Sequence, residues 1–483
     1  MTTSHADKAP APYDIAVLGA GPAGLSAAVT AAARGCRTVL IDAAARPGGQ
    51  YWRHRDGDDG ALHHDWSRFR HLRRRLETEP LLEYRPGHSI WHAERTKSGF
   101  AIHTVHDESP RTLHSRSVIV ATGAYDRQLP FPGWTIPGVF TAGAAQALLK
   151  GQGVLAGRRI AVAGAGPFLL PVAAALAEAG GRVVGVFEAG FPAAFARHPS
   201  AVLGNPAKLA EGAGYLRTLL QYRIPYRTRT AVVAAHGTNT VTGVTIARLD
   251  AQWRIEPGST QILTCDTVAV GYGFTPQTEI PLQLGCEMVR DTDGSLVARV
   301  DSRQRSTVKG VYIAGEASGV GGARLSAIEG ELAALHAAHM TGGPAPNRRH
   351  VARLLKQRST ERSFATAMHQ AFAVSDGWQT WLEPDTVVCR CEEVTAASIQ
   401  AAIDDLGAPD PRAVKLYARP GMGLCQGRVC AYATACLVAA ANHRKPTAHD
   451  LLGLAARPIA HPITLGALAA KPSNAHQQHS EGS

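Results

Sequence analysis

Four of the eight cysteines form two close pairs near the end of the chain. One residue separates Cys389 from Cys391, and four residues separate Cys425 from Cys430. Two thiol pairs this close in sequence predict a metal site. Iron–sulfur clusters take four thiolates and tolerate varied spacing, whereas zinc sites usually space a pair by two to four residues. We therefore favour an iron–sulfur cluster, with zinc or four unligated thiols as the alternatives.

The other four cysteines are interpreted as inert, Cys286 among them. Cys36 and Cys265 adjoin expected strands and suit small buried hydrophobic positions. Cys436 follows Cys430 on what should be one helix, which would have to turn both thiols inward for both to serve as ligands. Eight cysteines in 483 residues are too few for a secreted disulfide scaffold, so a cytoplasmic protein with reduced thiols is expected.

A glycine-rich turn near the N-terminus predicts a dinucleotide site. Gly19, Gly21 and Gly24 follow an apolar run at 13–18 and open an Ala-rich segment. The first glycine allows the tight turn, the second lets the backbone approach a pyrophosphate, and the third lets helix and strand pack closely. The helix N-terminus then favours the phosphate charge. Asp42 ends the next apolar run, where an acid accepts hydrogen bonds from a ribose.

The same pattern returns later in the chain with one position altered. Gly164 and Gly166 are present, but Leu169 occupies the third glycine position. A leucine there should force the helix away from the strand or crowd the pocket, and Pro171 removes a backbone donor near the helix start. Glu188 would still accept a ribose hydroxyl and would repel a 2′-phosphate. We interpret this unit as a structural domain with weak or no NAD turnover. A working NADH site is the alternative, and a bound adenine nucleotide, NAD or ATP, is compatible with either.

Both turns need a strand–helix–strand unit to hold them. Apolar strands are expected at 13–18 and 38–41 around the first turn, and at 159–163 and 182–187 around the second. Two such units of matching span predict an α/β fold with two nucleotide-type domains. A chain of 483 residues has room for about three domains. The cysteine-bearing module supplies the third.

The chain is basic, with a formal net charge of +11. Trp66, Phe69, Leu72 and Leu76 recur at helical spacing among arginines, which predicts an amphipathic helix with a basic outer face. A solvated face is favoured over an acidic docking surface, and no nucleic acid is expected as a partner. Residues 1–12 lack the apolar region of a signal peptide, and no apolar run is long enough to span a membrane.

Three segments resemble the two-dinucleotide flavoproteins. Residues 46–50, Arg-Pro-Gly-Gly-Gln, are similar to the loop on their flavin side, and residues 117–124, Ser-Val-Ile-Val-Ala-Thr-Gly-Ala, to their Ala-Thr-Gly segment. Residues 310–316, Gly-Val-Tyr-Ile-Ala-Gly-Glu, are similar to their last flavin motif, where an acid contacts the ribityl chain. That acid is commonly Asp and is Glu316 here. The resemblance covers about residues 13–340 and implies FAD in the first site.

The resemblance also implies which residues bind cofactor. Gln50, Tyr51 and Trp52 should lie near the isoalloxazine, and Gln50 is placed to hydrogen-bond the ring. The second unit would use Gly164, Gly166 and Glu188. The residues implied for the FAD site are Gly19, Gly21, Pro22, Ala23, Gly24, Asp42, Gly49, Gln50, Thr122, Gly123, Gly315 and Glu316.

The cysteine module resembles the bacterioferritin-associated-ferredoxin-like (BFD-like) 2Fe-2S domain. The similarity rests on residues 388–395, Val-Cys-Arg-Cys-Glu-Glu-Val-Thr, and 421–430, Gly-Met-Gly-Leu-Cys-Gln-Gly-Arg-Val-Cys. That domain commonly ends in Cys-x-x-Cys, so the cluster loop must differ here. The variant resembles FAD-containing subunits of heteromeric opine dehydrogenases, hydroxyproline dehydrogenases and hydrogen cyanide synthase, as does the ending at 457–468. It implies a 2Fe-2S cluster held by Cys389, Cys391, Cys425 and Cys430.

The expected fold class is therefore α/β, with two Rossmann-like dinucleotide-binding domains of the FAD/NAD(P)-binding flavoprotein type and a small helical C-terminal BFD-like 2Fe-2S domain. The second dinucleotide domain is inserted into the first. The expected boundaries are 10–125 and 275–342 for the FAD-binding domain, 126–274 for the degenerate NAD-like domain, 343–384 for a helical linker, 385–457 for the 2Fe-2S domain and 458–483 for the tail. The basic helix of the linker is expected to end at about Thr366.

The resemblance implies an electron-transfer subunit of a dehydrogenase. A smaller FAD-containing partner of the amine or amino-acid oxidase type would oxidise a C–N bond of an amine, amino acid or opine. Electrons would pass through the FAD and the cluster of this chain to quinone or another carrier. A flavin suits this relay because it takes two electrons together and releases them singly. The chain would be cytoplasmic or peripheral at the inner face of the membrane.

Other classes of function are less well supported. No general acid or base stands out among 21 histidines, so catalytic residues stay unassigned. Direct disulfide reduction is disfavoured because no cysteine lies at 49–53 or at 160–264, where relatives carry a redox pair. One alternative is a self-contained NAD(P)H-dependent reductase of a ferredoxin or small acceptor. Another, motivated by charge, is a redox-sensing or nucleic-acid-binding protein.

Overall fold

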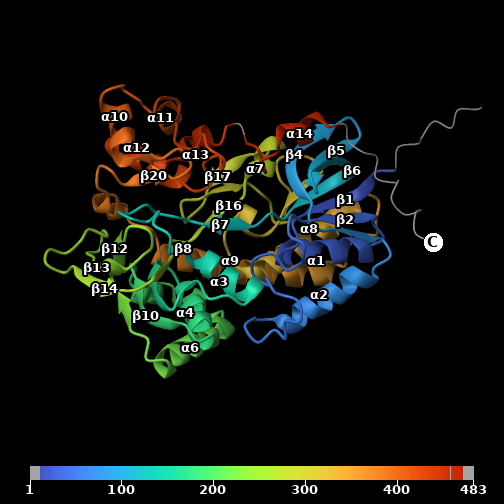
Figure 1. Ribbon diagram of the computed structural model, residues 1–483. Helices are drawn as coiled ribbons and strands as arrows, with labels where there is room; N and C mark the ends of the chain where they lie inside the picture. The colour runs from blue at the N-terminus through green and yellow to red at the C-terminus, as the bar shows by residue number, and fades with distance from the viewer. Residues whose placement is uncertain (1–10, 457, 471–483) are drawn as a thin grey trace, which may run out of the picture.

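Two sheets hold the two glycine turns, the first mixed and the second parallel, and helices pack against both (Figure 1). The computed structural model describes residues 11–456 and 458–470. Residues 1–10 and the second half of the predicted tail, 471–483, lie outside the described residues. No helix within the described part of the chain is long and apolar enough to cross a bilayer.

The first unit is built on a seven-stranded sheet with the order β3-β2-β1-β6-β5-β4, in which β19 also pairs with β6. The strands around the glycine turn run parallel and are almost wholly buried, which explains their continuous apolar sequence. The strands are β1 (Tyr13–Leu18), β2 (Thr38–Ile41), β3 (Leu82–Arg85), β4 (Ser89–Thr96), β5 (Gly99–His106), β6 (Ser109–Val120) and β19 (Val311–Ile313).

Three helices of the first unit pack beside this sheet. α1 (Pro22–Ala33) meets α8 (Ala323–Met340) at Gly330, where any Cβ would overlap with the backbone of Ala23. α2 (Trp66–Thr78) packs against α1 and buries Phe69, Leu72 and Leu76, which confirms the predicted amphipathic helix.

The second unit has its own five-stranded parallel sheet, with the order β11-β10-β9-β15-β8, and a three-stranded antiparallel sheet beside it. Its strands are β8 (Val139–Thr141), β9 (Arg159–Gly164), β10 (Arg182–Glu188), β11 (Tyr226–Thr228), β12 (Thr230–His236), β13 (Gly243–Arg248), β14 (Gln261–Thr264) and β15 (Thr267–Gly271). Its helices are α3 (Ala142–Gln152), α4 (Leu169–Glu178), η1 (Pro192–Arg197), α5 (Pro199–Leu203) and α6 (Pro206–Gln221).

The chain crosses between the two units at one place. β7 (Ala124–Asp126) carries it out of the first unit, and β16 (Phe274–Pro276) carries it back. The two strands pair antiparallel, with Phe274 opposite Asp126. The remaining elements of the first unit are α7 (Glu279–Gln283), β17 (Met288–Arg290), β18 (Leu296–Ala298) and η2 (Gly315–Ser318).

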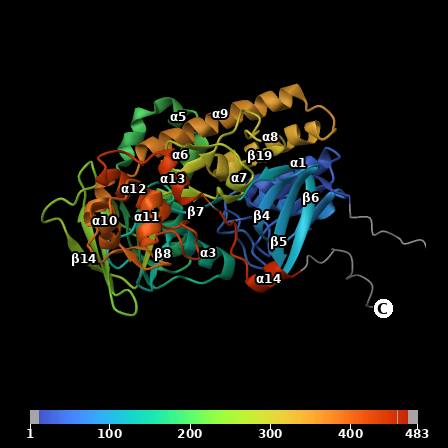
Figure 2. The same cartoon turned by 90° about the horizontal axis from the view of Figure 1, so that it is seen from above.

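A long helix joins the first unit to the cysteine module. α9 (Arg348–Ala371) begins against α8, where Leu354 packs on Leu332, and its later turns reach η1 and α5 of the second unit (Figure 2). It extends a turn beyond the end expected from the sequence. η3 (Asp376–Trp381) follows and buries Trp378 completely.

The cysteine module is small and mainly helical. Its core is continuous with that of the second unit, because Trp253 and Trp381 stack with ring centres 6.2 Å apart and belong to the same buried cluster as Val388. Its elements are β20 (Val387–Cys389), β21 (Val394–Thr395), α10 (Ala396–Asp404), α11 (Pro411–Ala418), α12 (Ala431–Ala441) and α13 (Ala448–Leu454), and α14 (Leu465–Ala469) lies beyond it near β6.

Candidate cofactor sites

The first glycine turn has the shape that a pyrophosphate requires. A Cβ on Gly19, whose φ is 103°, would overlap with the carbonyl of Ala121, and a Cβ on Gly24 would overlap with that of Gly19. A Cβ on Gly21 would instead meet only the Cα of Gly49, 4.0 Å away. α1 begins at Pro22, directly after Gly21. The backbone and helix terminus therefore leave room for a phosphate at Gly21.

Asp42 directly follows β2 and lies beside this turn. Its carboxylate accepts hydrogen bonds from the backbone N–H groups of Ala20 and Ala44, the second at 2.6 Å. Burial raises the pKa of Asp42, and these two hydrogen bonds oppose the rise. The side chain is partly exposed, and each carboxylate oxygen can accept a second hydrogen bond. Asp42 can therefore receive ribose hydroxyls as the sequence predicts.

The loops expected on the flavin side surround the same turn. Gly49, with φ of 59°, packs directly on Gly21, and Gln50 is exposed and accepts from Arg53 Nε at 3.1 Å. Thr122 donates from its hydroxyl to the carbonyl of Gln277 at 3.1 Å, next to Gly123 at the end of the sheet. The predicted residues thus gather at one edge of the first sheet.

Glu316 follows β19 on η2, as the last flavin motif predicts. Its carboxylate accepts from the N–H of Gly322 at 3.0 Å, just before α8 begins. Burial raises its pKa to about 7. Glu329 of α8 holds the same loop in place. Its fully buried carboxylate accepts a hydrogen bond from the N–H of Gly315 at 3.1 Å. The longer side chain of Glu316 therefore folds back on the helix start.

The second glycine turn differs from the first at the altered position. Leu169 is 1% exposed and packs in the core, so α4 begins only at Leu169, two residues later in the motif than α1 begins. The late start of α4 follows from the missing third glycine. The side chain of Leu169 cannot pack against the glycine turn as closely as Gly24 does in the first unit. Pro171 falls in the first turn of α4, where its missing N–H has no intrahelical partner to lose.

Glu188 ends β10 at the place of the ribose-binding acid. Its oxygens accept from the N–H groups of Gly166 at 2.9 Å and Gly190 at 2.8 Å. The side chain is 0% exposed, and burial raises its pKa to about 7. A Cβ on Gly190 would lie 3.3 Å from the ring of Phe372, just past α9. A ribose would reach Glu188 only if these neighbours moved.

The four predicted ligand cysteines come together in the C-terminal module. β20 ends at Cys389 and α12 begins after Cys430, and these two thiols hydrogen-bond each other. Cys391 and Cys425 form the second hydrogen-bonded pair. Cys391 is exposed, whereas Cys389 and Cys430 are buried. The cysteines separated in sequence therefore pair across the loop.

This arrangement distinguishes between the two metals. A single zinc draws four sulfurs to about 2.3 Å from one ion. Within the described residues, which include all four cysteines, no three of these sulfurs lie within 4.8 Å of one another. Two separate thiol pairs suit two irons better than one zinc.

Several hydrogen bonds converge on the thiol of Cys389. Its thiol hydrogen-bonds with Cys430, and with the backbone N–H groups of Gly421, Glu392 and Cys391, and together these lower its pKa to about 6. The Gly421 N–H lies 3.4 Å from Sγ. Hydrogen bonds of this kind stabilise a thiolate and tune a bound cluster.

The remaining cysteines lie apart from this site and are buried, as expected. Cys436 lies on α12 near Arg127, and burial raises its pKa to about 12. Burial likewise raises the pKa of Cys265 to about 11. Thiols held in the neutral form this strongly are poor ligands.

Contacts that the sequence did not suggest join the module to the first unit. Arg428, between two of the cysteines, forms an ion pair with Glu279 of α7 at 2.6 Å and donates to the carbonyl of Cys425 at 3.0 Å. A cavity of about 90 Å³ lies beside this pair, lined in part by Tyr125 and Tyr432. Because the partners are far apart in sequence, no spacing signal could have found them.

Comparison with known proteins agrees with the two expected cofactors. Residues 13–342 match the family described as pyridine nucleotide-disulphide oxidoreductase, and residues 387–440 match the BFD-like [2Fe-2S] binding domain. These matches confirm the expected FAD and 2Fe-2S cofactors and the expected fold class.

Several curated proteins align over most of the chain. The HcnB subunit of hydrogen cyanide synthase from Pseudomonas aeruginosa is 34% identical over 86% of this chain and 90% of its own length. An opine oxidase subunit from Agrobacterium tumefaciens is 32% identical over 96% of this chain and 92% of its own length. The alpha subunit of sarcosine oxidase from Corynebacterium sp. is 29% identical over 58% of this chain, which corresponds to 28% of that protein.

Solved structures show the same fold. L-proline dehydrogenase from P. horikoshii superimposes with a TM-score of 0.69 at 19% identity, over 95% of this chain and 80% of its own. Thioredoxin reductase from Lactococcus lactis superimposes with a TM-score of 0.51 at 19% identity, over 68% of this chain and 99% of its own. The chain is thus an FAD-dependent oxidoreductase that belongs to the pyridine nucleotide-disulphide oxidoreductase family and carries a C-terminal BFD-like [2Fe-2S] binding domain.

Proposed function

We propose that this chain is the electron-transfer subunit of a heteromeric dehydrogenase that oxidises the C–N bond of an amine, amino acid or opine. A smaller FAD-containing subunit of the amine or amino-acid oxidase type carries out that oxidation. Electrons then enter the FAD of this chain and leave through its 2Fe-2S cluster to quinone or another carrier. The names of the aligned relatives, which are subunits of opine oxidase, hydrogen cyanide synthase and sarcosine oxidase, support a partner of this kind.

The observation that carries the proposal is the docking of the thiol site onto the flavin unit. The Arg428–Glu279 ion pair anchors the cluster loop on α7, with side chains only 12% and 17% exposed. A buried pair of this kind is strongly weakened when either partner is lost. The two cofactor sites are therefore held together by the fold, as a relay between them requires.

The residues assigned to each cofactor are part of the proposal. FAD is held by the glycine turn at 19–24, by Asp42 at the ribose and by the loops at 49–50, 122–123 and 315–316. The cluster is held by the two thiol pairs. When bound, the flavin accepts electrons in pairs and the cluster passes them on singly. An electron acceptor approaches the cluster from the side of Cys391, which is the exposed ligand.

The second unit serves mainly as a scaffold in this proposal. The late start of α4 and the enclosure of Glu188 support weak or absent NAD turnover. The family name and the intact Gly164–Gly166 turn favour the competing function, an NAD(P)H-dependent reductase of a ferredoxin or small acceptor. The two functions differ in whether the chain by itself takes electrons from a nicotinamide.

Anaerobic mixing of the purified chain with NADH tests this difference. We expect flavin absorbance to persist with NADH and to bleach with dithionite, which shows that the flavin is intact. Rapid bleaching by NADH would overturn the proposal in favour of the reductase. The complex isolated with its natural partner should show cluster reduction by an amine, amino acid or opine from a panel, and the lone chain should not.

A further inference from the structure

A row of buried charges runs from the flavin loop toward the cluster. It begins at Glu329 on α8, which is 0% exposed and holds the N–H of Gly315. Arg362 and Arg358 of α9 donate to the same carboxylate at 2.6 and 3.2 Å. The long linker helix is therefore tied to the backbone of the last flavin motif.

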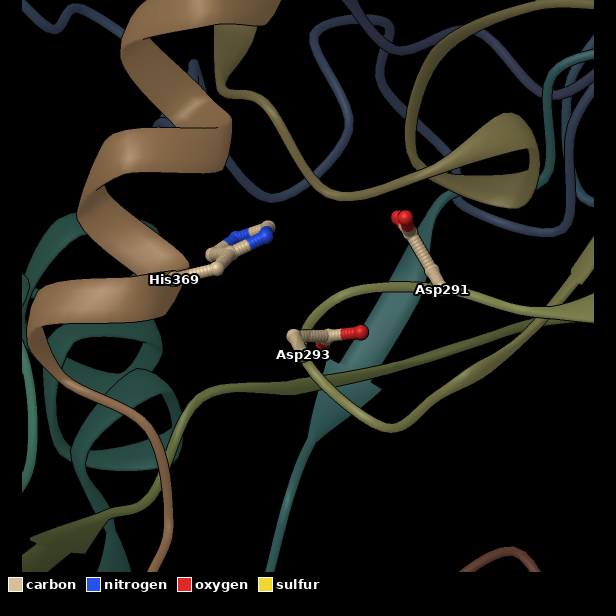
Figure 3. Close-up of side chains that lie close together, drawn as sticks. All are labelled: Asp291, Asp293 and His369. Atoms are coloured by element: carbon tan, nitrogen blue, oxygen red, sulfur yellow. The ribbon is translucent and has the colours of Figure 1, made fainter. Parts of the chain in front are cut away.

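The row continues through two aspartates and a histidine (Figure 3). Asp291 and Asp293 lie in the turn between β17 and β18, and His369 points toward them from α9. One carboxylate oxygen of each aspartate and one ring nitrogen of the histidine lie within 4.8 Å of one another. Asp291 and Arg362 also lie close together beside Gly319. A Cβ on Gly319 would lie 2.8 Å from a carboxylate oxygen of Asp291 and 2.6 Å from a guanidinium nitrogen of Arg362.

The far end of the row reaches the cluster module. Asp293 accepts from Arg127 at 2.8 Å, and the side chains are 10% and 3% exposed. The guanidinium of Arg127 lies over the ring of Tyr432 on α12, 4.3 Å from its centre. Tyr432 is two residues beyond Cys430. The row thus links the loop of the last flavin motif with the helix that begins after Cys430.

The fixed charges of this row cancel when the imidazole is neutral. Arg127 pairs with Asp293, and Arg358 and Arg362 both pair with Glu329. With Asp291 beside Arg362, the row holds three carboxylates and three guanidiniums. Burial lowers the pKa of His369, while the two aspartates oppose this and the two nearest arginines reinforce it. The groups that face His369 are Asp291 and Asp293 from the β17–β18 turn, Arg127 after β7 and Arg362 on its own helix.

The same atoms do not suit a metal ion. Asp293 already accepts from Arg127, from the N–H of Ser295 at 2.9 Å and from its hydroxyl at 2.7 Å. Asp291 accepts from the N–H of Thr292 at 2.8 Å. The guanidiniums of Arg127 and Arg362, next to these carboxylate oxygens, would repel a cation. A proton on the imidazole is the positive charge that this site can accept.

We propose that His369 is a proton-accepting site that becomes protonated when an electron enters the redox centres of this chain. An added negative charge leaves the balanced row with an excess that the imidazole can neutralise without breaking an ion pair. The nitrogen takes a proton from solvent, which the partly exposed side chain can reach. Under the proposed function, oxidation of one C–N bond releases two electrons and two protons. The reaction therefore supplies the electrons to the redox centres and returns protons to the solvent from which His369 takes its proton.

Glu316 is the other titratable group near the row. It lies close to Arg362 and Glu329, and burial raises its pKa to about 7. Its carboxylate faces the start of α8 through the N–H of Gly322, whereas His369 faces the β17–β18 turn. A test must therefore separate these two groups.

The test is potentiometric titration of the holoenzyme with dithionite between about pH 5 and 9. In the unaltered chain, the cluster midpoint potential should fall as pH rises through the range where the imidazole loses its proton, and the cluster is the centre to follow because a flavin takes up protons on its own ring when it is reduced. His369→Gln should remove that slope, and Asp291→Asn should move it to lower pH because a neighbouring negative charge is lost. His339→Gln, at the exposed end of α8, is the matched control and should leave the slope unchanged.

Two results would overturn the proposal. One is a cluster midpoint potential that does not change with pH in the unaltered chain. The other is a slope that survives in His369→Gln and disappears in Glu316→Gln, which would assign the proton to the flavin-loop acid. Should His369→Gln fold poorly, the Asp291→Asn shift decides by itself. Since dithionite replaces substrate, NADH and partner, these outcomes are independent of whether the proposed electron donor is correct.

Discussion

The guanidinium of Arg127 lies 4.3 Å from the centre of the Tyr432 ring and joins the nucleotide units to the cluster module. Arg127 follows β7, where the chain leaves the first unit, and Tyr432 lies on the helix that begins after Cys430. A desolvated cation–π contact contributes about 2 kcal/mol. The module is therefore held in place by buried side chains as well as by its linker.

Replacement of Arg127 by Met should destabilise the protein by about 3–5 kcal/mol, because Asp293 is left buried and unpaired. Chemical denaturation measures this loss. Arg116→Met is the control, since its pair with Asp14 is exposed and should contribute at most about 1 kcal/mol. Equal effects of the two changes would show that the Arg127 pair does not hold the module.

Cys425→Ser should abolish the visible absorbance and the iron content of the cluster while FAD stays bound. A serine oxygen is a poorer ligand than a thiolate for iron in such clusters. Cys436→Ser is the matched control on the same module, because that thiol is buried away from the two pairs. Retention of the cluster in Cys425→Ser, or its loss in both variants, would contradict the ligand assignment.

Gly21→Ala should lower FAD occupancy at least about tenfold, which corresponds to about 1.4 kcal/mol, without unfolding the chain. The added methyl has space in the protein, since its nearest neighbour would be the Cα of Gly49 at 4.0 Å, but it occupies the place of the pyrophosphate. Bound flavin per chain after gel filtration is the measurement. Gly166→Ala alters the equivalent position of the second unit, and its FAD content should be unchanged.

The stability of the cluster module should depend on the ionisation of Asp450. Hydrogen bonds from Arg444 and Thr447 lower the pKa of this carboxyl to about 2. A lowered folded-state pKa contributes stability above the unfolded value of about 4 that is lost as pH falls toward about 2. Allowing for solvent screening, we expect a loss of about 1–2 kcal/mol over this range. Asp450→Asn should remove this part of the acid sensitivity in denaturation curves, and an unchanged profile would contradict it.

The local geometry of the first glycine turn could be predicted from the sequence because residue spacing specifies it. Gly19 and Gly24 are required by overlaps within the turn itself, and Asp42 follows from the length of the strand–helix–strand unit. The gathering of Cys389 with Cys430 followed from the resemblance of two short motifs. The amphipathic pattern around Phe69 also predicted its helix correctly.

Features that depend on distant contacts could not be predicted. The sequence suggested that Leu169 would disturb the second turn, but the structure shows how, by a later start of α4. The enclosure of Glu188 depends on Phe372, which approaches from the end of a helix much later in the chain. Arg127 carries no motif, since its role depends on Asp293 and Tyr432. Such contacts leave no periodic trace in a single sequence.

The paired strands β7 and β16 have a consequence for how this chain could have diverged. Because the chain leaves and re-enters the first unit side by side, the second unit is an insertion whose interior can change without moving the FAD-binding framework. Mutations that erode a nicotinamide site therefore need not harm the flavin site. An ancestor with two working nucleotide sites could thus lose one electron donor and gain another without rebuilding its redox core.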